Sequence, residues 1–134
     1  GMKELVSTIP VKMSVVSNSS QYQANRSLNI TGMWELFEGR CYTSDMVTHP
    51  KPAPDVYLHA LDQTQQAKES SIVVEDSPTG VKAAKSAGLR VIGFLGASHI
   101  MEGHYDKLAA AGADWIAKDA EEVKTILTKL GFYK

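Results

Sequence analysis

The feature that most constrains the fold of this chain is an apolar run that ends in two carboxylates and turns directly into a helix. Ile72–Val74 is short and β-branched, Glu75 and Asp76 follow it, and a helix-starting segment comes next. A continuous apolar run is typical of a strand buried on both faces of a parallel sheet. Open α/β sheets bind ligands at the carboxyl ends of their strands, and Mg²⁺ prefers carboxylate oxygens. The run therefore predicts an α/β fold with a magnesium site at a strand end.

The same residues also have a purely structural interpretation. Ser77 can cap the following helix and Pro78 can be its first residue, which requires no carboxylate. Two upstream segments favour a ligand site instead, because each places polar side chains at the end of a predicted strand or at the start of a predicted helix. Ser14–Ser19 is a short strand that runs into hydroxyls and an amide, and Thr48–Asp55 is a proline-rich loop that carries Lys51. A hydroxyl, a lysine and two carboxylates at one sheet edge suit phosphate chemistry, since they stabilise charge on phosphoryl oxygens.

These motifs resemble those of the haloacid dehalogenase-like (HAD) hydrolases, in the branch that includes β-phosphoglucomutase and sugar-phosphate phosphatases. The resemblance extends from Lys3 onward and is carried by Lys51-Pro52-Ala53-Pro54-Asp55, Val74-Glu75-Asp76-Ser77 and Ala87-Gly88. It implies a Mg²⁺-dependent phosphatase or phosphomutase that acts on a small phosphorylated metabolite through an aspartyl-phosphate. The family roles it implies fall on the following residues: Ser17 and Asn18 in phosphate binding, Ser17 and Lys51 in catalysis, Lys51 also in charge neutralisation, and Glu75 and Asp76 as magnesium ligands.

One family motif is missing from the sequence. The nucleophile of these enzymes lies in an Asp-x-Asp motif on the first strand, and no Asp-x-Asp occurs in the 134 residues. We interpret residues 1–134 as a single partial core domain that lacks this first, central strand and the helical cap, with Gly1-Met2 as an expression scar and start. This polypeptide alone is expected to be inactive, because the covalent step requires a nucleophile, and its Mg²⁺ binding is expected to be weak or absent.

The predicted fold is a Rossmann-like three-layer α/β/α parallel sheet, because short strands alternate with helices along the chain. Strands are predicted at 13–16, 40–43, 72–74, 89–95 and 114–117, and helices at 20–30, 54–66, 78–87, 105–111 and from 119 to about 130. The resemblance to the family implies that the missing strand would lie between the strands that end at Ser17 and Glu75. Two open inner edges favour new pairing, so we predict closure of the sheet, a strand-mediated homodimer or a complementing N-terminal segment.

Composition excludes several other classes of function. The net charge of −1 gives no basic excess for nucleic acid or a membrane surface, and no apolar run approaches the roughly 20 residues that span a bilayer. Cys41 is the only cysteine, which predicts a reducing cytoplasm. Two alternative functions remain open: a non-catalytic interaction or phosphate-binding domain, and a receiver-like domain, whose acidic cluster would normally lie on the first strand.

A few other polar residues are weaker candidates for the site. Asp45 lies near the lysine loop, and His49 lies two positions before Lys51. His99 and His104 lie near a predicted loop where they could contact substrate. No histidine has metal-ligand spacing with a cysteine or with another histidine.

Overall fold

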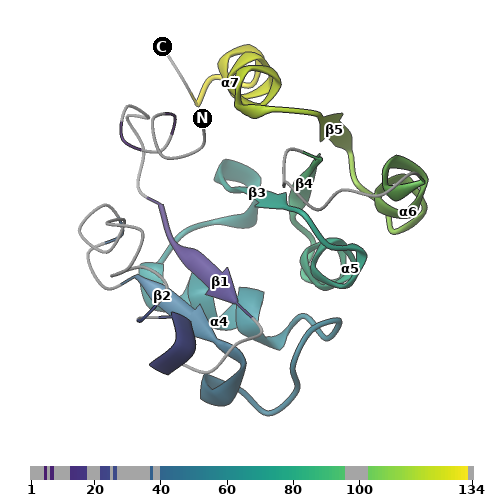
Figure 1. Ribbon diagram of the computed structural model, residues 1–134. Helices are drawn as coiled ribbons and strands as arrows, with labels where there is room; N and C mark the ends of the chain where they lie inside the picture. The colour runs from purple at the N-terminus through teal and green to yellow at the C-terminus, as the bar shows by residue number, and fades with distance from the viewer. Residues whose placement is uncertain are drawn as a thin grey trace.

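The computed structural model describes residues 13–17, 22–24, 40–95 and 103–132, together with Leu5, Ser7, Arg26 and Phe37. In this part of the chain, strands and helices alternate as the sequence predicts (Figure 1). The fold belongs to the α/β class, with parallel strands covered by helices. Among the described residues, no helix is both long enough and apolar enough to cross a lipid bilayer.

The strands form two parallel groups. One sheet pairs β1 (Val15–Ser17) with β2 (Cys41–Thr43). The other has the order β3 (Ile72–Glu75), β4 (Arg90–Phe94), β5 (Trp115–Ala117). Glu75 pairs with Gly93 at the end of β3, so the first of the two carboxylates still belongs to the ladder.

The helices lie in two layers on opposite faces of the strands. Four α-helices are described: α4 (Asp55–Thr64), α5 (Pro78–Ser86), α6 (His104–Ala110) and α7 (Ala120–Lys129). Two 3₁₀ turns, η1 (Ser44–Met46) and η2 (Lys68–Ser70), complete the elements. The predicted helix at 20–30 lies mostly outside the described residues, although 22–24 and 26 are helical.

Two apolar clusters show which helices cover which face. Val91 of β4 packs in one cluster with residues of α4, α5 and α6, including Val81 and Leu108. Its neighbour Ile92 packs in the other with Val123 of α7. Adjacent strand residues point to opposite faces, so α4, α5 and α6 form one layer and α7 belongs to the other. This is the three-layer α/β/α arrangement that the alternation predicts.

One side of α4 is buried and the other faces solvent. Leu58 is 41% exposed, whereas Tyr57 is 4% exposed and Val56 is fully buried. A helical face combines residues three or four positions apart, and here the buried face consists of Val56, Tyr57 and Ala60. Leu58 falls on the opposite side of the helix.

The two sheets remain separate within the described residues, because β1 and β3 are not paired. The Val15 N–H donates to the Arg40 carbonyl at 2.8 Å, which directs the Val15 peptide groups toward β2. Peptide groups alternate in direction along a strand that has parallel neighbours, so those of Val16 face the side of β3. The predicted closure of the sheet is therefore wrong here, and the open edge of β1 carries the Val16 carbonyl.

Candidate active site

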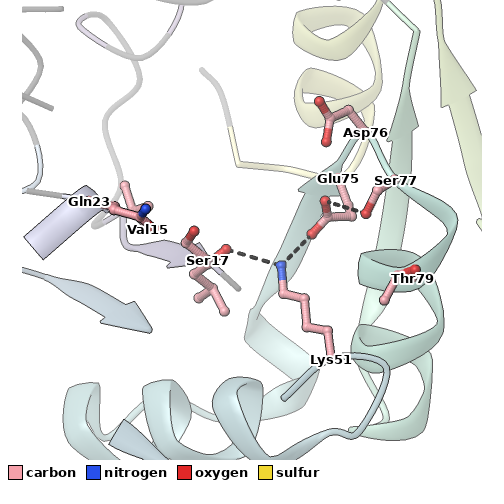
Figure 2. A pocket seen from close by; sticks show the side chains of 9 residues that line it. Val15, Ser17, Gln23, Lys51, Glu75, Asp76, Ser77 and Thr79 are labelled. Carbon is pink, nitrogen blue, oxygen red and sulfur yellow. Dashed lines mark hydrogen bonds and ion pairs between the residues drawn. The ribbon is translucent and has the colours of Figure 1, made fainter. Parts of the chain in front are cut away.

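A cavity of about 700 Å³ lies at the carboxyl ends of β1 and β3. Figure 2 shows that its side chains come from β1, the helical residues 22–24, the lysine loop, the end of β3 and the start of α5. The lining residues are Val15, Val16, Ser17, Gln23, Lys51, Glu75, Asp76, Ser77 and Thr79. The cavity therefore lies where parallel α/β sheets bind their ligands.

Lys51 connects the two sheets across this cavity. Its side chain is 6% exposed, and its ammonium donates to the Val16 carbonyl at 3.1 Å and to Glu75 Oε2 at 2.9 Å (Figure 2). One charge thus contacts the open edge of β1 and the end of β3. A buried charge is tolerated only when it is paired and hydrogen-bonded, and Lys51 meets both conditions.

The loop that carries Lys51 is held at its base by Asp55. The Asp55 carboxylate accepts from the His49 backbone N–H at 3.2 Å and lies 3.0 Å from His49 Nδ1. The Ala53 N–H donates to the Pro50 carbonyl at 3.0 Å, which closes a turn around the lysine. His49 therefore contributes to loop structure, and its ring is exposed rather than directed at the cavity.

Glu75 is the most heavily bonded carboxylate of the site. Its Oε2 accepts from Lys51 and from the Tyr57 hydroxyl, the latter at 2.8 Å, and its Oε1 lies 3.4 Å from Ser77 Oγ. Gly80 makes room for this carboxylate, because a Cβ at position 80 would overlap the Glu75 side chain. No buried side-chain nitrogen or oxygen lacks a partner in the described part of the chain, so this network is complete.

Tyr57 is a site residue that the sequence did not reveal. Burial, followed by the negative charge of Glu75, raises the pKa of the Tyr57 hydroxyl well above its usual value. The hydroxyl therefore stays protonated and acts as a donor. The Lys51 ammonium lies 5.1 Å from the centre of the Tyr57 ring, within the range of a cation–π contact. The one feature of the sequence that could have indicated this role is the position of Tyr57 in the first turn of the helix that follows the lysine loop.

Asp76 and Ser77 connect β3 to α5. Asp76 is exposed and lines the cavity, while Ser77 caps α5 by accepting from the Gly80 N–H at 3.0 Å. His104 Nε2 lies 2.8 Å from the Asp76 carbonyl. A carbonyl only accepts, so His104 Nε2 must carry the hydrogen. This hydrogen bond joins the start of α6 to the turn at Asp76. His104 thus interacts with the protein backbone.

The structure brings together most of the predicted site residues. Ser17, Lys51, Glu75 and Asp76 line one cavity, and their roles in binding and catalysis stay predictions. Asn18 and His99 lie outside the described residues. Asp45 is not among the lining residues and accepts a hydrogen bond from Thr43 beside it.

The oxygens at the end of β3 fit a hard divalent cation. No group of three or more histidine, cysteine or acidic residues that could hold a metal ion occurs in the described ranges, and the carboxylates that line the cavity are Glu75 and Asp76. Mg²⁺ is commonly held by one or two carboxylates and completes its shell with water and phosphate oxygens. The donor set therefore matches Mg²⁺ bound together with a phosphorylated ligand.

Comparison with known proteins identifies the class to which this fold and site belong. The family model described as haloacid dehalogenase-like hydrolase matches residues 1–94. The chain belongs to this family.

Relatives in the phosphatase and phosphomutase branch share its sequence and structure. A phosphorylated carbohydrates phosphatase of Thermotoga maritima is 31% identical over 127 residues, which are 95% of this chain and 56% of the relative. A haloacid dehalogenase-like protein of unknown function from Agrobacterium tumefaciens superposes with a TM-score of 0.91 at 32% identity, covering 97% of this chain and 60% of the other. The structure of a β-phosphoglucomutase candidate from Thermotoga maritima superposes with a TM-score of 0.83 at 28% sequence identity. The match covers 97% of this chain and 59% of the other. The chain thus spans little more than half the length of these proteins.

Proposed function

We propose that this chain is the core of a Mg²⁺-dependent phosphatase or phosphomutase that acts on a small phosphorylated metabolite through an aspartyl-phosphate. Membership of the family and its phosphatase relatives support phosphate chemistry. Because the sequence has no Asp-x-Asp, we further propose that this polypeptide by itself binds phosphate but turns over little or no substrate. On the ground of its single cysteine, we propose a reducing cytoplasm as its compartment.

The observation that carries this proposal is the buried ammonium of Lys51 at the meeting point of the two sheets. It faces the same cavity as Ser17 and Asp76, so a phosphate there would meet a cationic group and a hydroxyl donor together. Lysine suits this task as a compact point charge. Glu75 and Asp76 would hold Mg²⁺, which when bound would neutralise charge on phosphoryl oxygens. The protein residues would orient the phosphate and fix its position.

Phosphate binding tests the proposal directly. Titration calorimetry with inorganic phosphate in the presence of MgCl₂ should show binding to the whole chain. The Lys51→Met variant should bind about 10- to 100-fold more weakly, because a hydrogen bond to a charged group contributes about 1.5–3 kcal/mol. Lys82→Met, which removes an exposed lysine of α5, should bind like the unaltered chain.

Circular dichroism would show whether each variant is folded, and Ser17→Ala provides a second, milder test of the same pocket. Equal affinities for Lys51→Met, Ser17→Ala and Lys82→Met would contradict the assignment. Turnover is tested separately. Binding without hydrolysis of a generic phosphomonoester is the result expected for this polypeptide, whereas hydrolysis that Lys51→Met abolishes would contradict the expected lack of turnover and show that the polypeptide is itself an enzyme.

We also propose that the open edge of β1 is paired by a second copy of this chain. Unpaired strand edges favour such association, and the Val16 peptide groups face the open side of β1. Sedimentation velocity should show a concentration-dependent dimer, and Val16→Pro, which removes the N–H on that side, should weaken it. A monomer at all concentrations would contradict the dimer and would favour a complementing N-terminal segment as the partner.

A further inference from the structure

We propose that Tyr57 is the positioning residue that keeps the Glu75 carboxylate in place when Lys51 engages a phosphate. The inference rests on the proposed magnesium and phosphate site and assigns a task to a residue outside the cavity lining. The Tyr57 hydroxyl donates to Glu75 Oε2, the same oxygen that receives the Lys51 ammonium. A metal ligand held in this way usually depends on its outer partner for orientation.

The two donors to Glu75 Oε2 differ in how firmly they are fixed. Tyr57 lies in the first turn of α4, is 4% exposed, and belongs to the apolar cluster formed with α5 and α6. Its ring has two side-chain torsions, so little freedom remains once it is packed. Lys51 has a long flexible stem and also donates to the Val16 carbonyl. Tyr57 is thus the rigid donor and Lys51 the adjustable one.

This difference becomes important when an anion enters the cavity. A phosphate would attract the Lys51 ammonium, because opposite charges in a partly buried site interact strongly. Glu75 would then lose part of its contact with Lys51, and Ser77 at 3.4 Å is a weak substitute. The Tyr57 hydroxyl, 2.8 Å from Glu75 Oε2, would remain as a donor to the carboxylate. Tyr57 therefore allows Lys51 to serve the ligand without releasing the carboxylate.

Tyr57→Phe isolates the hydroxyl, because the ring that fills the core and faces Lys51 is kept. In saturating inorganic phosphate, we expect Tyr57→Phe to weaken Mg²⁺ binding about 10-fold, at the low end of the range for outer partners of metal ligands. Without phosphate, the loss should be smaller than about 3-fold, because Lys51 still holds Glu75. The matched control is Tyr105→Phe, on a tyrosine that is 57% exposed, and it should change neither affinity.

Two further measurements separate a positioning role from simple packing. In a Glu75→Ala background, Tyr57→Phe should no longer affect Mg²⁺ affinity, since the acceptor of the Tyr57 hydroxyl is then absent. The carboxyl ¹³C resonance of Glu75, observed by NMR without metal, should shift in Tyr57→Phe and not in Tyr105→Phe.

Equal losses with and without phosphate, a loss that persists in the Glu75→Ala background, or an unmoved Glu75 resonance would overturn the inference. If the unaltered chain binds no Mg²⁺, the proposed magnesium site of this polypeptide fails, and the metal-free resonance still decides whether Tyr57 positions Glu75.

Discussion

Replacing Glu75 with alanine is expected to lower the free energy of unfolding by about 3–5 kcal/mol, the range for removal of one partner of a buried ion pair. The Lys51 side chain is only 6% exposed, and the substitution would remove the carboxylate that its ammonium contacts at 2.9 Å. Urea denaturation followed by circular dichroism measures this loss.

Two variants show whether the loss comes from the broken ion pair between Glu75 and Lys51. The double variant Glu75→Ala with Lys51→Met should recover most of the stability, because the buried cation is then absent. Glu69→Ala, on an exposed residue of η2, should change the free energy by less than about 0.5 kcal/mol. A loss for Glu75→Ala as small as that of Glu69→Ala would mean that solvent compensates Lys51, and the pair would not be a buried one.

Gly80→Ala is expected to destabilise the protein by about 2–3 kcal/mol, in the range for overfilled positions. A Cβ at residue 80 would overlap the Glu75 carboxylate, which would have to move away from Lys51 and Tyr57. The ordinary gain of about 1 kcal/mol for alanine over glycine inside a helix offsets only part of this cost. Thermal or urea unfolding measures the net change.

A double-variant cycle identifies the cause of the Gly80 effect. With Glu75 already replaced by alanine, the overlap disappears, and Gly80→Ala should become neutral or stabilising. Lys82→Ala, on an exposed position of the same helix, serves as the control for changes in helix propensity. If Gly80→Ala costs the same in both backgrounds, the glycine is required for the backbone of α5 and not for the carboxylate.

The sequence was sufficient to predict the elements that form the site. The apolar run before Glu75 is β3, and Ser77 and Pro78 begin α5 as the capping pattern indicates. The placement of Lys51 near the acidic residues followed from parallel topology, because strand ends of one kind meet at one edge. These predictions succeeded because they depend on local patterns and on the shared direction of parallel strands.

Other features could not be predicted because they depend on long-range packing. The choice of Tyr57 over Leu58 as the buried residue reflects how α4 rests against α5 and α6, which no local pattern contains. The end of α4 was predicted near Gln66, yet the helix stops at Thr64 with Gln65 in a left-handed conformation, at φ 55°. Glycine is the usual residue at such a position, so a glutamine there does not indicate the end of a helix.

The bond between the Lys51 ammonium and the Val16 carbonyl has a consequence for association. A strand that paired with β1 would offer its own N–H to that carbonyl and release the lysine toward an anion. A bound phosphate that draws the lysine away would in turn leave the Val16 carbonyl available to a pairing strand. Because coupling between two binding events is reciprocal, phosphate would favour strand pairing by the same factor by which strand pairing favours phosphate binding. We therefore expect phosphate to tighten self-association of this chain. The Lys51 ammonium would then control both phosphate binding in the cavity and dimer formation through β1.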